Sequence, residues 1–191
     1  MNIISGIARG IKLEVPKGLF VRPTSVIAKK SIFDSIRNFN DFTVVDLFAG
    51  TGALGLEAAS RGASNVYFFE NSRVNSDIIR SNIDKIVKSG VNANLKVIVS
   101  DALKAYENLP EISEKVDLIF ADPPYNDSAD ALATLLNNDS FANWARNATF
   151  IFEMPSEASR KPKLEDITLW SIVKKSNFGQ SVFIFLRLKK N

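Results

Sequence analysis

The chain has 191 residues, of which 46% are hydrophobic and 24% charged, and it carries a net charge of +3, as is ordinary for a globular protein of one domain. It has no stretch of about 18 uncharged apolar residues and no secretory signal pattern, so we expect a soluble, cytoplasmic protein with no membrane segment. The absence of Cys and His excludes disulfides, thiolate or imidazole metal sites and a cysteine nucleophile; we expect no metal, and catalysis by carboxylates, backbone groups, Lys or Tyr.

The first 40 residues differ from the rest of the chain. They can bury little by themselves, so we expect an N-terminal extension (1–40) packed on a main domain (41–191). The expected elements are a β-hairpin of Asn2 to Ala8 and Ile11 to Val15 around Arg9-Gly10, a loop from Pro16 to Arg22, and a helix from Val26 to about Asn38 capped by Thr24 or Ser25.

From about residue 43, apolar runs alternate with helix-length segments. The expected strands are Thr43 to Phe48, Asn65 to Glu70, Leu95 to Val99, Val116 to Ala121, Thr149 to Glu153, Ile167 to Val173 and Ser181 to Leu188. The expected helices include Gly55 to Arg61, Ser72 to Lys88 and Ala129 to Leu136. This alternation predicts an α/β fold with a mostly parallel sheet covered on both faces. The last two strands should form an antiparallel hairpin through a turn at Lys174 to Gln180.

A glycine-rich turn follows the first of these strands. Gly50, Gly52 and Gly55 give the pattern Gly-x-Gly-x-x-Gly, which lets the backbone approach a ligand closely. Glu70 ends the second strand, where it can accept hydrogen bonds from ribose hydroxyls. A dehydrogenase would have the same spacing, so dinucleotide binding is an alternative at this point.

Two further acids belong to this region. Asp46, inside the first strand, suits the cationic groups of S-adenosylmethionine and would repel the pyrophosphate of NAD, although it can also act as a helix cap. Asp101 follows the third strand, where it can meet an adenine amine or cap a helix.

The tetrad Asp122-Pro123-Pro124-Tyr125 ends the apolar run Val116 to Ala121. An acid, a backbone segment without N–H groups and an aromatic ring together suit a planar base that bears an exocyclic amine. A proline pair after a strand can also simply end the strand.

Charge is segregated along the chain. Residues 1–40 carry a net +5, residues 156–191 a net +5, and residues 41–155 a net −7. Two basic ends around an acidic centre favour a polyanionic partner, although basic ends also serve as solubilising surface.

These motifs resemble those of S-adenosylmethionine-dependent methyltransferases of the Rossmann-like class, and more closely the family that methylates a guanine N2 in bacterial small-subunit ribosomal RNA. The similarity runs through nearly the whole chain. The matching segments are Ile4 to Gly6, Arg9 to Leu13, Val21 to Ser25, Asp46 to Glu57, Glu70, Asp101-Ala102 and Asp122 to Tyr125. The tetrad is shared with DNA adenine methyltransferases, so it indicates an amine target, whereas Arg22-Pro23-Thr24 indicates the ribosomal family. Val26-Ile27 and Lys29-Lys30 depart from the charged pattern usual in that family.

The resemblance implies a seven-stranded Rossmann-like methyltransferase sheet, S-adenosylmethionine as cofactor, and ribosomal RNA or the small ribosomal subunit as partner. We also expect a monomer. The expected cofactor-binding residues are Asp46, Phe48, Ala49, Gly50, Thr51, Gly52, Glu70, Asn71, Asp101, Ala102 and Asp122. The expected catalytic residues are Asp122, Pro123, Pro124 and Tyr125. The expected RNA-binding residues are Arg9, Lys12, Lys17, Arg22, Lys29 and Lys30.

In the expected reaction, the Asp122 carboxylate and the Pro123 carbonyl accept hydrogen bonds from the amine, and Tyr125 stacks on the base. The base must be flipped or unpaired to reach the site. The alternatives are methylation of another RNA or of DNA adenine N6, and an RNA-binding module without catalytic activity.

Overall fold

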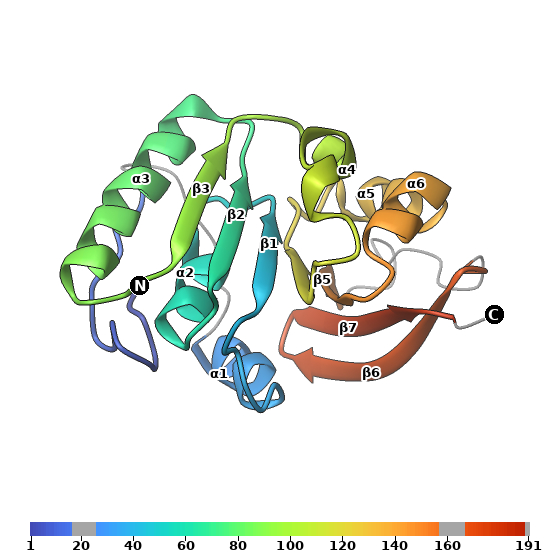
Figure 1. Cartoon of the computed structure of the whole chain (residues 1–191). Coiled ribbons are helices and arrows are strands. Elements are labelled where there is room, and N and C mark those ends of the chain that lie inside the picture. The colour runs from blue at the N-terminus through green and yellow to red at the C-terminus, as the bar shows by residue number, and fades with distance from the viewer. Residues whose placement is uncertain (17–25, 157–166, 190–191) are drawn as a thin grey trace.

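The computed structural model of the protein describes residues 1–16, 26–156 and 167–189 (Figure 1). Its centre is a seven-stranded sheet with the strand order β3-β2-β1-β4-β5-β7-β6. The strands are β1 (Thr43–Leu47), β2 (Asn65–Phe69), β3 (Asn94–Ile98), β4 (Leu118–Ala121), β5 (Thr149–Pro155), β6 (Trp170–Phe178) and β7 (Ser181–Leu188). The first five are parallel, whereas β7 is antiparallel to both β5 and β6. The predicted α/β fold is confirmed.

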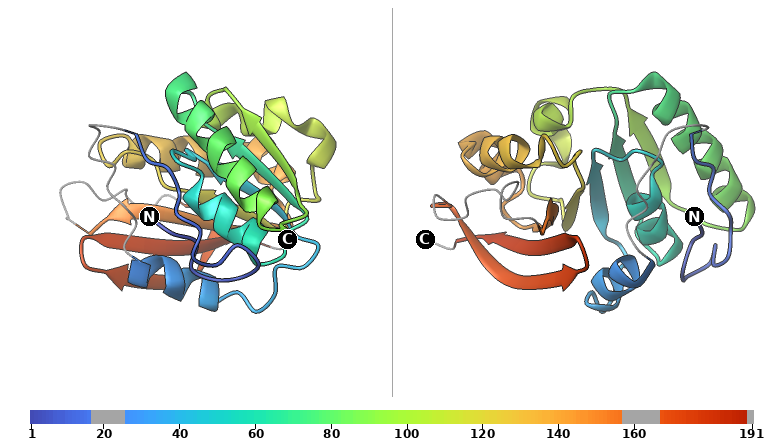
Figure 2. Two further views of the ribbon diagram at one scale, coloured as in Figure 1. Left: turned by 90° about the vertical axis from the view of Figure 1, so that its left-hand side faces the viewer. Right: turned by 180° about the vertical axis from the view of Figure 1, so that it is seen from behind.

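Helices cover both faces of the sheet (Figures 1 and 2). One face packs against α1 (Val26–Asp34), α2 (Ala53–Ser60) and α3 (Arg73–Lys88). The other packs against α4 (Ala105–Asn108), α5 (Ser128–Leu136), α6 (Asp139–Trp144) and the 3-10 turns η1 (Ala102–Lys104) and η2 (Pro110–Ile112). Neighbouring strand residues point to opposite faces: Val44 belongs to the first core and Val45 to the second. Both faces are buried, which explains the continuous apolar runs of the central strands.

The C-terminal hairpin differs from the predicted one in its turn. Strand β6 continues to Phe178, so only Gly179 and Gln180 connect it to β7, and the expected turn from Lys174 is wrong. Lys174 and Lys175 are exposed on this edge strand. Because an edge strand has one side open to water, polar residues can continue it, and a polar stretch there is easily mistaken for a turn.

The N-terminal segment pairs with itself around Arg9-Gly10 as predicted, but over a shorter length. Asn2 and Lys12 form an antiparallel β-bridge, and the Ile3 N–H donates to the Ile11 carbonyl at 3.0 Å. The residues between them turn back over α2. The expected strand does not continue to Ala8, because the next backbone N–H groups are bonded to α2: those of Ile4 and Ser5 donate to the Glu57 carboxylate, and that of Ile7 to the Ser60 carbonyl. The expected loop and cap at residues 17–25 lie outside the described residues, and α1 ends at Asp34 rather than near Asn38.

A buried carboxylate, Glu57, connects three parts of this face. Its side chain is fully buried, and it accepts the Ile4 and Ser5 N–H groups at 2.7 and 3.0 Å. It also pairs with Arg61 at 2.8 Å and with the buried Lys29 of α1 at 3.4 Å. Burial lowers the pKa of Lys29, and the Glu57 charge opposes that shift. Glu57 therefore joins the N-terminal segment and α1 to α2.

In the parts of the chain that the structure describes, no helix is long and apolar enough to cross a membrane.

Replacing Glu57 with alanine should reduce stability strongly. Lys29 and two backbone N–H groups would lose a buried acceptor, and breaking a buried pair in this way costs about 3–5 kcal/mol. Urea denaturation followed by circular dichroism measures the change. Asp77→Ala is the control, because its pair with Arg80 is solvent-exposed and worth little. Equal effects of the two substitutions would contradict the role of Glu57.

Candidate active site

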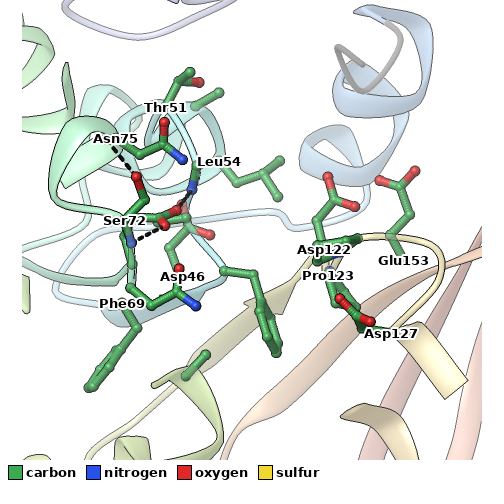
Figure 3. A pocket seen from close by; sticks show the side chains of 18 of the residues that line it. Asp46, Thr51, Leu54, Phe69, Ser72, Asn75, Asp122, Pro123, Asp127 and Glu153 are labelled. Atoms are coloured by element: carbon green, nitrogen blue, oxygen red, sulfur yellow. Dashed lines mark hydrogen bonds between the residues drawn. The ribbon is translucent and has the colours of Figure 1, made fainter. Parts of the chain in front are cut away.

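A cavity of about 640 Å³ opens at the carboxyl ends of β1, β2, β4 and β5 (Figure 3). It lies where the strand order changes direction, between β1 and β4, which is the usual ligand position in an open parallel sheet. Its volume is within the range of roughly 300–1,000 Å³ that small-molecule sites have.

Almost all of the expected cofactor-binding and catalytic residues line this cavity. From the expected cofactor set, they are Asp46, Phe48, Ala49, Gly50, Thr51, Glu70, Asn71, Asp101, Ala102 and Asp122. Pro123, Pro124 and Tyr125 of the tetrad also line it. Gly52 does not; it is the N-cap residue of α2.

The glycine-rich turn is held in a sharp conformation. Phe48 and Gly52 have φ values of 57° and 77°, in the left-handed region that costs a non-glycine residue about 1 kcal/mol or more. The Ala49 N–H donates to the Phe69 carbonyl at 2.9 Å, and the Gly50 N–H donates to the Glu70 carboxylate at 2.9 Å. Glu70 also accepts the Ser72 N–H at 2.8 Å. These bonds fix the end of β1 against the end of β2.

The third glycine, Gly55, allows α2 to approach the sheet. A Cβ atom at Gly55 would lie 2.4 Å from the Phe68 ring and 2.9 Å from Val66, closer than real contacts permit. Its N–H donates to Asp46 at 2.8 Å. The helix start is therefore held by both packing and a hydrogen bond.

Asp46 is 2% exposed, and its side chain points to the start of α2. Burial raises the pKa of Asp46 to about 7, and the negative charge of Glu70 adds to this, whereas the Gly55 N–H and Lys29 oppose it. The bond from the Gly55 N–H shows that Asp46 acts as a hydrogen-bond acceptor for the start of α2. Since Asp46 also lines the cavity, a cationic ligand group there would favour its ionised form.

Asp101 likewise caps a helix, because its carboxylate accepts the Leu103 N–H of η1 at 2.9 Å. It is exposed and lines the cavity. Capping uses one carboxylate oxygen, so this contact is compatible with a ligand interaction.

The tetrad leaves β4 as a closed turn. The Asp127 N–H donates to the Pro124 carbonyl at 2.9 Å, and the Ser128 hydroxyl donates to the Tyr125 carbonyl at 3.1 Å. The Tyr125 hydroxyl lies 3.2 Å from Glu153 Oε1 and 2.7 Å from Ser181 Oγ, and Ser181 Oγ donates to Glu153 Oε1 at 2.6 Å. This triangle of side chains ties the tetrad to β5 and β7.

The family model described as Conserved hypothetical protein 95 matches residues 1–187. The chain belongs to this family. Ribosomal RNA small subunit methyltransferase D of Haemophilus influenzae is 30% identical over 183 residues, which cover 94% of this chain and 89% of that protein. The Escherichia coli K12 protein of the same name is 34% identical over 128 residues, 65% of this chain and 60% of that protein. The solved structure of yhhF from Escherichia coli, a candidate methyltransferase, superposes with a TM-score of 0.72 at 27% identity and covers 99% of this chain and 98% of that one.

Sequence reasoning missed several residues that line the cavity. They are Met1, Ala53, Leu54, Phe69, Ser72, Asn75, Asp127, Glu153 and Ser181. Glu153 had a usable signal, because it is an acid near the end of an expected strand, as Glu70 is. Ser181 had none, since it reaches the cavity only through the antiparallel pairing of β7 with β5.

The structure describes four of the six expected RNA-binding residues. Arg9, Lys12 and Lys30 are exposed, and Lys30 pairs with Asp34. The prediction for Lys29 is wrong, because this side chain is 2% exposed and is paired with Glu57. Lys17 and Arg22 lie outside the described residues.

Among the described residues, no group of three or more Asp or Glu side chains is arranged to hold a metal ion. Six carboxylates line the cavity, and none of its described lining residues is Lys or Arg: the acids are Asp46, Glu70, Asp101, Asp122, Asp127 and Glu153.

Replacing Asp46 with asparagine should change the pH dependence of stability. The pKa of Asp46 is about 7 in the folded protein and 3.8 in the unfolded chain, so ionisation of the buried carboxyl lowers the free energy of unfolding. This loss is absent below pH 4, grows between pH 4 and 7, and reaches at most roughly 4 kcal/mol above pH 7. An asparagine carbonyl can still accept the Gly55 N–H. Without ligand, Asp46→Asn should therefore gain stability relative to the native protein between pH 5 and pH 8. Urea denaturation at both pH values tests this, and a difference between the proteins that is independent of pH would contradict it.

Proposed function

We propose that the protein transfers a methyl group from S-adenosylmethionine to the exocyclic N2 amine of a guanine in small-subunit ribosomal RNA. Membership of the family makes the chain an S-adenosylmethionine-dependent ribosomal RNA methyltransferase. The observation that carries the finer proposal is the position of the tetrad. Asp122 to Tyr125 borders the same cavity as the glycine-rich turn, so an acceptor base and a methyl donor can meet there.

The donor set of the cavity fits this cofactor. S-Adenosylmethionine supplies an electrophilic methyl group on a sulfonium, and it also carries an ammonium. The carboxylate-rich lining favours such cations and disfavours the pyrophosphate of NAD, which argues against the dehydrogenase alternative. We assign Asp46 to the cationic end, Glu70 to the ribose hydroxyls and Asp101 to the adenine amine.

At the tetrad, the acceptor amine is conjugated with its ring and is a weak nucleophile. Hydrogen bonds from the amine to the Asp122 carboxylate and the Pro123 carbonyl would make its nitrogen more tetrahedral and direct its lone pair across the cavity. Tyr125 would stack on the base, with its ring held through the bonds of its hydroxyl to Glu153 and Ser181. Positioning therefore accounts for most of the proposed catalysis, and we propose that no metal takes part.

We assign RNA contact to the N-terminal extension, residues 1–40, on the domain formed by residues 41–191. The bridge of Lys12 with Asn2 brings Lys12 close to Met1, which lines the cavity. Arg9 lies near Ser60, at the far end of α2 from the glycine-rich turn, about 12 Å away at 1.5 Å per helical residue. Both positions suit phosphates that flank a flipped base. We further propose that the protein acts in the cytoplasm as a monomer.

Incubation with labelled S-adenosylmethionine and either small ribosomal subunits or their naked RNA tests this function. Nucleoside analysis should recover the label in N2-methylguanosine. Label in N6-methyladenosine would instead support the adenine alternative, and absence of label from both substrates would contradict the proposal.

In the same assay, Asp122→Ala should lower kcat by at least about 100-fold, because the amine loses its charged acceptor. Asp130→Ala removes a nearby acid on α5 that is exposed and does not line the cavity, and should retain native activity. A native rate for Asp122→Ala would rule out the role of the tetrad.

Lys12→Ala and Arg9→Ala should each weaken RNA binding and reduce the slope of log K against log salt concentration by about 0.7 to 1, because one phosphate contact is lost. Filter binding at several salt concentrations measures this. Lys115→Ala, in the acidic central part of the chain, is an exposed control whose slope should not change. Unchanged slopes for both Lys12→Ala and Arg9→Ala would contradict the assignment of RNA contact to the N-terminal extension.

A further inference from the structure

The second carboxylate beside the tetrad, Glu153, has a place in the site that the mechanism above does not use. Strands β4 and β5 are parallel, with Ala121 paired to Phe152, so Asp122 and Glu153 occupy the next positions on neighbouring strands. Both line the cavity, and Figure 3 shows their side chains pointing in the same direction. The site therefore presents two carboxylates next to each other.

Glu153 is held firmly in this position. Its side chain is 4% exposed, and Oε1 lies within hydrogen-bonding distance of both the Ser181 and the Tyr125 hydroxyl groups. Each hydroxyl has a single proton, and both protons are used inside the triangle of Tyr125, Glu153 and Ser181. The triangle therefore offers acceptors, rather than donors, to a base in the cavity.

Two adjacent acceptors match one base edge best. The Watson–Crick edge of guanine carries two neighbouring donors, N1–H and the N2 amine, whereas adenine and cytosine place an acceptor nitrogen beside their amine. A base with such a nitrogen would bring a lone pair against the buried Glu153 carboxylate, which is unfavourable at low dielectric.

We propose that Glu153 determines the choice of guanine by accepting its N1–H while Asp122 accepts from the N2 amine. This inference rests on the proposed function, since it assumes that the N2 amine is the methyl acceptor. Ser181 is a positioning residue in this arrangement, because it acts through Glu153.

The test uses a short RNA that contains the target guanine mapped in the labelling assay, and the same RNA with 2-aminopurine at that position. 2-Aminopurine keeps the acceptor amine but has a bare N1. The native enzyme should prefer guanine by about 100-fold or more in kcat/KM, because a site built to bind a donor rejects an analogue without it.

In Glu153→Gln, the preference for guanine over 2-aminopurine should fall to about one or reverse, since the glutamine amide can donate to the bare N1. Comparing the two preferences removes the difference in intrinsic reactivity between the amines. Tyr125→Phe is the matched control: it removes one bond to Glu153 but keeps the carboxylate, so the preference for guanine should persist even if kcat falls.

Two results would overturn the inference alone: equal use of both RNAs by the native enzyme, or an unchanged preference in Glu153→Gln. The first needs no variant, so the inference remains testable if Glu153→Gln fails to fold, which thermal unfolding would reveal. Failure of the native enzyme to methylate the guanine RNA would instead overturn the proposed function.

Discussion

The close contact between helix α2 and the sheet at Gly55 is the constraint on which the site depends. With no Cβ at this position, the helix start reaches Val66 and Phe68, and the Gly55 N–H meets the buried Asp46 carboxylate. That contact sets where the glycine-rich turn leaves β1. Within this turn, the Gly50 N–H donates to Glu70 at the end of the neighbouring strand. The wall of the cavity therefore follows from the packing of one residue without a side chain.

The other end of α2 positions the N-terminal extension. Glu57 and Ser60 lie within two turns of Gly55, and they take up backbone N–H groups from residues 4 to 8 as well as the ammonium of Lys29. The part of this segment that is not paired with another strand thus satisfies its polar groups on the helix. Because a single short helix holds both the turn and the extension, a change in the packing of α2 affects the cavity and the surface assigned to RNA together.

The strands, and the site residues at their ends, could be predicted from the sequence because both depend on local patterns. Buried parallel strands appear as apolar runs, and their carboxyl ends meet at one edge, so Asp46, Glu70, Asp101 and Asp122 could be placed near one cavity. The errors come from partners distant in the chain. Alternation in residues 2–15 predicts a longer hairpin than the one that forms, because Glu57 accepts backbone N–H groups that the longer strands would use. Lys29 has the sequence context of a surface cation, but the same acid lies beside it in the core. Ser181 enters the site only because β7 is inserted between β5 and β6.

The distribution of charge places a restriction on how a nucleic acid can approach. The chain carries a net positive charge, yet the described lining of the cavity is acidic. Phosphates are repelled from such a lining, so in the proposed reaction only the uncharged base of a polyanion enters the cavity and its backbone stays outside. The same carboxylates that exclude phosphate favour cationic groups of a cofactor and the donor-rich edge of guanine. Charge thus selects both ligands of the proposed reaction, and it requires that the base leave its stack before the methyl acceptor reaches Asp122.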